Sequence, residues 1–93
     1  MIVGVPWCRQ EDYDAFYAMF EDRHNLPREW VEFVKIAEMS ESLYKKNGEI
    51  VERVYVDPKK FHRWCAENGY RVDRDARLAF AIAEAIRRHP GKN

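Results

Sequence analysis

The chain has 93 residues, and its 16 basic and 16 acidic side chains cancel to a formal net charge of zero. This length predicts one domain over residues 1–93, ordered over 1–89 and ending in a loose tail over 90–93. The chain is 46% hydrophobic and 14% aromatic, which excludes the composition of a disordered protein. Zero net charge argues against a protein that coats nucleic acid non-specifically and against a polybasic membrane anchor. No apolar run approaches the roughly 20 residues that a membrane span needs, so we expect no membrane partner.

The N-terminal segment and the cysteine content indicate the cellular compartment in which the protein resides. Residues 1–7 lack the basic start and the long apolar stretch of a signal peptide. The two cysteines, Cys8 and Cys65, are too few for a disulfide scaffold. Together these observations predict a cytoplasmic protein. Sequence alone leaves open whether Cys8 and Cys65 lie near each other.

The first half of the chain predicts a strand and two helices. Residues 2–5 form a β-branched run that Pro6 stops, which is typical of a strand end. A helix follows over about 10–22, and its apolar residues at helical spacing predict a buried stripe. A second helix runs over about 27–46, with Pro27 in its first turn and Gly48 beyond its end. The stripe of the first helix is Tyr13, Phe16, Tyr17 and Phe20, and the half of the second helix assigned to the core is Trp30, Phe33, Val34, Ile36, Ala37, Leu43 and Tyr44.

The second half predicts another strand and two more helices. Residues 50–56 read as a strand, partly exposed because Glu52 interrupts its apolar face. Asp57 is the expected N-cap of a helix that ends at Asn68 and Gly69. Asp73 is the expected N-cap of a last helix over about 74–89.

These elements predict a small α+β domain in β-α-α-β-α-α order, mostly helical, with two short strands. The order suggests an internal duplication, in which Val3–Pro6 matches Val54–Pro58 and Ile36–Glu38 matches Ile82–Glu84; a chance match of short motifs is the alternative. Two strands alone make a marginal sheet. Either the helices cover its outer edges, or a second subunit completes a four-stranded sheet.

The last helix is the main candidate for an interface. Apolar residues cover more than half of its circumference, so it should lie near the centre of the domain or between subunits. The candidates for packing or interface contact are Phe80, Ile82 and Ile86, and those for polar contact are Arg74, Arg77 and Arg88. For Arg77 we expect a buried or interface ion pair, with Asp73 or Glu84 as the partner, or a role as a ligand anchor.

A reactive pair and a metal site both have weak support. His62 and Cys65 lie three residues apart on one predicted helix, within reach of a thiolate–imidazole pair. Cys65 also belongs to an apolar stripe with Phe61 and Trp64, which favours a buried, inert thiol. No motif with metal-ligand spacing and no glycine-rich phosphate loop occurs, so we expect neither a metal nor a cofactor.

Charge is unevenly distributed along the chain. The first 22 residues are acidic and residues 71–93 are basic. The basic end could bind phosphate or an acidic partner, or the two ends could pair with each other or with the ends of a second copy in a dimer. A nucleic-acid site would use Arg71, Arg74, Arg77, Arg87 and Arg88, but overall neutrality removes the usual electrostatic attraction.

Several short motifs carry a resemblance to a known group of proteins. They are Val54–Pro58, Phe61, Trp64-Cys65, Gly69, Asp75–Arg77 and Phe80-Ala81, together with the opening Ile2–Trp7 and Tyr13. In these motifs the chain resembles a family of short bacterial proteins of unknown function. The resemblance implies a stand-alone soluble bacterial protein, and it implies no activity.

The leading hypothesis is therefore a small protein-interaction or regulatory module that acts as a homodimer; the missing catalytic motifs argue against an enzyme without excluding one. The alternative is a nucleic-acid-binding protein that uses the C-terminal arginines. A further alternative is a small-molecule binder or minor enzyme with His62 and Cys65 near a pocket.

Overall fold

The computed structural model describes residues 1–91 and confirms the predicted α+β class and element order. Lys92 and Asn93, which belong to the predicted tail, lie outside the described residues. The elements are β1 (Ile2–Trp7), the 3₁₀ helix η1 (Gln10–Asp12), α1 (Tyr13–Met19), the 3₁₀ helix η2 (Arg23–Asn25), α2 (Trp30–Lys46), β2 (Ile50–Tyr55), α3 (Pro58–Asn68) and α4 (Arg74–Arg88).

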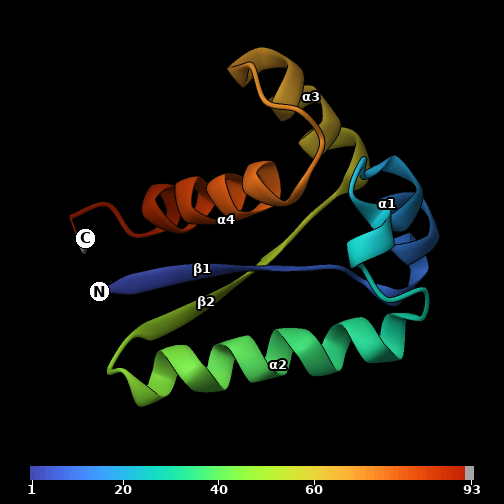
Figure 1. Ribbon diagram of the computed structural model, residues 1–93. Helices are drawn as coiled ribbons and strands as arrows, with labels where there is room; N and C mark the ends of the chain where they lie inside the picture. The colour runs from blue at the N-terminus through green and yellow to red at the C-terminus, as the bar shows by residue number, and fades with distance from the viewer. Residues whose placement is uncertain (92–93) are drawn as a thin grey trace.

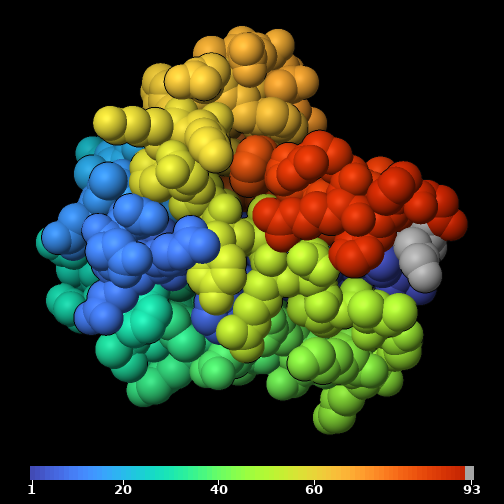
Figure 2. Space-filling model, turned by 180° about the vertical axis from the view of Figure 1, so that it is seen from behind, coloured from blue at the N-terminus to red at the C-terminus, as the bar shows by residue number. Residues whose placement is uncertain are grey.

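The two strands pair with each other within the chain, in parallel, from Ile2 opposite Ile50 to Trp7 opposite Tyr55. Parallel strands need a long crossover, and here α1 and α2 provide it. Figure 1 shows α4 on one face of the strand pair and α2 on the other, with α1 and α3 gathered where the strands end. Seen from behind, yellow-green residues that include β2 reach the surface between α4 and α2 (Figure 2).

Alternation along β1 sends its side chains to two different helices. Val5 and Trp7 pack with Ala37 of α2. Gly4, which precedes Val5 and points to the opposite face of the strand, faces α4, where a Cβ would lie 2.0 Å from the carbonyl oxygen of Ala81. Glycine at this position therefore lets the α4 backbone approach β1 closely.

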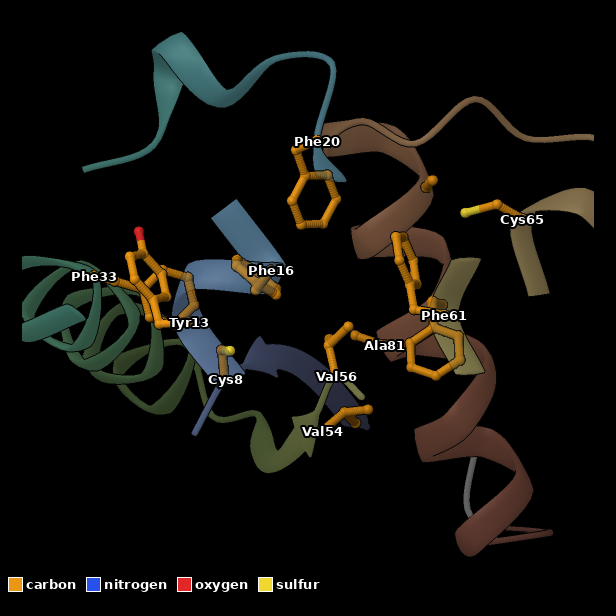
Figure 3. Packing of buried hydrophobic residues seen from close by; sticks show 12 residues of the cluster. Cys8, Tyr13, Phe16, Phe20, Phe33, Val54, Val56, Phe61, Cys65 and Ala81 are labelled. Carbon is orange, nitrogen blue, oxygen red and sulfur yellow. The ribbon is translucent and has the colours of Figure 1, made fainter. Parts of the chain in front are cut away.

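The main core is built from aromatic rings that join α1, α2, α3 and α4 (Figure 3). Phe16 and Phe20 of the predicted stripe are fully buried, with ring centroids 4.7 Å apart. Phe20 contacts Phe61 of α3 at 5.5 Å, and Phe61 contacts Phe80 of α4 at 5.3 Å. This chain of rings holds the helices at the end of the strands together.

The predicted helix caps at Asp57, Asp73 and Gly48 are confirmed. Asp57 accepts a hydrogen bond from the backbone N–H of Lys60, and Asp73 accepts one from Ala76, both at 3.1 Å. Gly48 follows α2 with a φ of 82°, as expected for a left-handed residue at a helix end.

Three predicted boundaries in the first half were wrong. The helix predicted over 10–22 is α-helical only over Tyr13–Met19, because Phe20 turns extended with a ψ of 132°. The helix predicted from Pro27 begins at Trp30, because Glu29 is extended and the Tyr13 hydroxyl donates to the Pro27 carbonyl oxygen. The first strand continues through Pro6 to Trp7. Proline is tolerated because β1 bonds to β2 through residues on either side, as in the 2.7 Å bond from the Val56 N–H to the Trp7 carbonyl oxygen.

The predicted buried half of α2 was also partly wrong. Phe33 and Ala37 are buried as expected, but Ile36, Leu43 and Tyr44 are exposed. The buried stripe continues instead with Glu41, whose carboxylate accepts two hydrogen bonds from Arg53 of β2, at 2.6 and 3.0 Å. A charged residue thus occupies a packed position because strand β2 supplies a bidentate partner.

The two segments aligned as a possible duplication occupy different places in the fold. Pro6 lies inside β1, whereas Pro58 begins α3. Ala37 is buried against the sheet, whereas Ala83, its counterpart in the alignment, is exposed.

Candidate interaction surface

The apolar residues of α4 predicted to form an interface differ in burial. Phe80 is buried between Phe61 and Trp64, with its ring centroid 5.3 and 5.4 Å from theirs, so it belongs to the core. Ile82 and Ile86 remain 50% and 47% exposed on the far side of the helix. Of the predicted apolar set, these two isoleucines are accessible to another molecule.

Arg77 forms a buried ion pair, but its partner is neither Asp73 nor Glu84. Two of its nitrogens donate to the two carboxylate oxygens of Asp22, each at 3.0 Å, and its guanidinium lies 4.7 Å from the ring centroid of Phe20. Burial raises the pKa of Asp22, but the hydrogen bonds and positive charge of Arg77 outweigh burial and leave this pKa below its usual value. Arg77 therefore ties α4 to the segment after α1.

Most of the other C-terminal arginines also have carboxylate partners within the chain. Glu52 accepts hydrogen bonds from His89 at 2.9 Å and from Arg88 at 3.2 Å, and these lower its pKa. Arg74 is exposed and has no ion pair among residues 1–91. The pairs are Arg71 with Glu21, Arg77 with Asp22, Arg87 with Glu84, and Arg88 with Glu52 and Glu84. The acidic and basic ends of the chain thus pair with each other at Glu21 and Asp22, which leaves little unpaired positive charge for a phosphate backbone.

The predicted reactive pair is divided between the core and the surface. Cys65 is buried, and burial raises the pKa of its thiol, whereas His62 is exposed on α3. Cys8 is buried too, and burial together with the charges of Asp12 and Glu11 raises its pKa to about 12. Both thiols are free. Within residues 1–91 no group of three or more His, Cys, Asp or Glu side chains is arranged to hold a metal ion.

The surface that sequence reasoning missed is the outer face of α2. Ile36, Met39 and Leu43 are 54%, 67% and 63% exposed. Figure 1 shows α2 along the outside of the molecule, with the strand pair on its inner side only. Three large apolar side chains exposed on one helix make this face the candidate interaction surface.

These side chains form a regular seam with one charged residue at each end. The spacing along Glu32, Ile36, Met39, Leu43 and Lys46 is four, three, four and three residues, which is the a/d repeat of a coiled-coil seam. We call these five residues the α2 seam. A shallow hollow runs along it, with Met39, Leu43 and Lys46 among its lining residues. The four–three spacing is present in the sequence, but α2 carries a second apolar stripe beside it, so the sequence pattern alone predicts one broad apolar face.

The α2 seam is complementary to itself in one orientation. Met39 lies at its middle, Glu32 seven residues before it and Lys46 seven residues after it. Antiparallel pairing about a two-fold axis at Met39 would place Glu32 of each copy opposite Lys46 of the other. Parallel pairing would oppose like charges at both ends, so the charges favour the antiparallel arrangement.

Comparison of the chain with protein-family models, with curated proteins and with solved structures found no match. Among the described residues, no helix has both the length and the apolar character that crossing a bilayer would require.

Proposed function

We propose that this protein is a small protein-interaction module that acts as a homodimer, with the α2 seams of two copies packed antiparallel. The single observation that supports this most directly is the row of exposed apolar residues on α2 with opposite charges at its two ends. Pairing would bury Ile36, Met39 and Leu43 of both copies, and burial of apolar side chains is the main favourable term in association.

The α2 seam is a better candidate than the exposed part of α4 or the free edge of β2. The exposed part of α4 offers two large apolar residues, Ile82 and Ile86, without a regular repeat. The free edge of β2 is partly occupied, because Arg88 donates to the backbone carbonyl oxygen of Arg53 at 3.3 Å. A covered edge is a poor template for strand addition.

The proposal includes a cytoplasmic, bacterial setting. Two free, buried cysteines suit a reducing compartment, and the motif resemblance is to short bacterial proteins. A module of this kind would present the remaining surfaces of its dimer, including the α4 pair Ile82 and Ile86, to other proteins.

The proposal is tested by measuring mass in solution against protein concentration. Sedimentation equilibrium from about 10 to about 500 μM should show the 11.2 kDa chain moving toward twice that mass. Met39→Glu places two carboxylates against each other at the two-fold axis and should keep the chain monomeric throughout this range.

The matched control is Ile82→Glu, which introduces the same charge at an exposed apolar position on α4. It should dimerise like the parent chain. A parent that remains monomeric at the highest concentration overturns the proposal. If Ile82→Glu abolishes dimerisation and Met39→Glu does not, the interface lies on α4 instead.

A further inference from the structure

A hollow of about 440 Å³ lies where the two parallel strands end, away from the α2 seam. Trp7 and Tyr55, the last residues of β1 and β2, lie side by side there, with ring centroids 6.3 Å apart and ring planes tilted by 55°. Trp30, at the start of α2, contributes a third aromatic wall. The volume of the hollow is within the usual range for small-molecule sites. Its position also fits, because ligands of open parallel sheets bind at the carboxyl ends of the strands.

The indole N–H of Trp7 has no partner in this structure. Trp7 is 4% exposed, and its Nε1 is buried with no acceptor among the described residues. The comparable group of Trp30 does have one, since its Nε1 donates to the Cys8 carbonyl oxygen at 2.8 Å. A buried donor without an acceptor is costly, and because this nitrogen has no exposed area, a ligand in the hollow could supply its acceptor only after a neighbouring side chain moves.

The polar side chains at the rim of the hollow make no hydrogen bond or ion pair among residues 1–91, and two of them carry opposite charges. The guanidinium of Arg9 lies 4.6 Å from the Tyr55 ring centroid and has no ion pair or hydrogen bond among residues 1–91. Arg9 is exposed, so its side chain is free to swing away and uncover the ring. Gln10 and Glu11 complete the rim. A ligand with a full charge would gain from Arg9 or Glu11 and be opposed by the other.

From these observations we infer that the hollow is a binding site for a small, uncharged, planar heterocycle that carries both hydrogen-bond acceptors and donors, as nucleobases do. Tyr55 supplies a stacking surface for a flat ring once Arg9 moves aside, whereas the Trp7 ring is 4% exposed and already carries the Arg53 guanidinium 3.9 Å from its centroid. Trp7 and Arg9 supply donors, Glu11 supplies an acceptor, and the Gln10 amide supplies both. This site does not depend on the α2 seam or on dimerisation.

The test is a titration with adenosine and cytidine followed by the side-chain indole N–H signals in a ¹H–¹⁵N correlation spectrum. The chain has three tryptophans, and Trp64 of α3 is not among the residues that line the hollow. Signals of Trp7 and Trp30, assigned through Trp7→Phe and Trp30→Phe, should shift while that of Trp64 stays. Benzoate and benzylamine, flat rings with a full negative or positive charge, serve as ligand controls.

Two tyrosines of similar exposure provide the matched protein variants. Tyr55, which is 39% exposed, lines the hollow, whereas Tyr70, which is 42% exposed, does not. Tyr55→Ala should raise the Kd for the nucleoside at least about fivefold through lost stacking, and Tyr70→Ala should leave it unchanged. The site is refuted if nucleosides at about 10 mM shift neither the Trp7 nor the Trp30 signal, or if all three signals move together. Tighter binding of benzoate or benzylamine would refute the uncharged class of ligand.

Discussion

Gly4 and Ala81 bring β1 and α4 closer together than any side chain would allow. A Cβ at Gly4 would lie 2.0 Å from the Ala81 carbonyl oxygen and 3.0 Å from the Cβ of Ala85. The obstacle at Ala81 is backbone, which cannot rotate away as the end of a flexible side chain could. The position of α4 over the sheet therefore depends on the missing side chain at residue 4.

Gly4→Ala is predicted to destabilise the fold by about 3 kcal/mol, because α4 must move away from β1 and lose packing there. Thermal unfolding followed by circular dichroism should show the melting temperature falling by more than about 10 °C. The control is Gly48→Ala, where a Cβ would meet nothing within 4 Å but φ is 82°. It should cost only about 1–2 kcal/mol, from backbone conformation alone. Equal losses for the two variants would contradict the close approach of α4.

The Asp22–Arg77 pair predicts a specific dependence of stability on pH. The folded state holds the pKa of Asp22 below its usual value, because the Arg77 hydrogen bonds and charge outweigh the opposing effect of burial. A lowered carboxylate pKa adds stability above the unfolded pKa of about 4, and this stability is lost as the pH falls through the folded pKa. Asp22→Asn should thus cost about 2 kcal/mol at pH 7 and much less near pH 2.

Urea unfolding of the parent and of Asp22→Asn at several pH values measures this difference directly. Comparing two chains at each pH cancels the contribution of other carboxylates, such as Glu52 and Glu84, whose pKa values are also lowered. A difference that stays constant from pH 7 to pH 2 would show that Asp22 acts through packing rather than charge.

How far the sequence predicted this fold depended on whether each signal was local or long-range. The caps at Asp57 and Asp73 and the turn at Gly48 were predicted correctly, because each needs only its immediate neighbours along the chain. The partner of Arg77 was not, because Asp22 lies 55 residues away and nearer acidic residues were available. Glu41 was not expected in the core, because its partner Arg53 comes from another element.

The same distinction explains the candidate surfaces. Ile36 and Leu43 are exposed because α2 packs on the sheet through its other apolar stripe. The sequence of a helix with two apolar stripes does not reveal which of them will pack on the sheet. The hollow at Trp7, Trp30 and Tyr55 joins three elements, and only the parallel register of the strands brings these residues together.

Both cysteines are predicted to react slowly with a thiol reagent at neutral pH. Cys8 and Cys65 are each 1% exposed, and burial raises the pKa of both, so little thiolate forms and little of it is accessible. Absorbance with a chromogenic disulfide should show two thiols reacting promptly in denaturant and neither doing so in the folded protein. Rapid modification of folded protein that disappears in Cys65→Ser would revive the hypothesis of a reactive pair with His62.

Exchanging the charges at the two ends of the α2 seam tests the antiparallel orientation itself. In the proposed dimer Glu32 faces Lys46 of the second copy, so Glu32→Lys alone and Lys46→Glu alone should each place like charges together and weaken association. The double variant restores opposite charges at both ends and should recover most of the parental dimer affinity, as measured by sedimentation equilibrium. Circular dichroism of each variant checks that the fold survives, because Glu32 also pairs with Lys35 at 3.2 Å on the same helix. If the double variant is no better than the single ones, the two residues do not meet across the interface. If none of the three variants changes the dimer affinity, the two ends of the α2 seam lie outside the dimer interface.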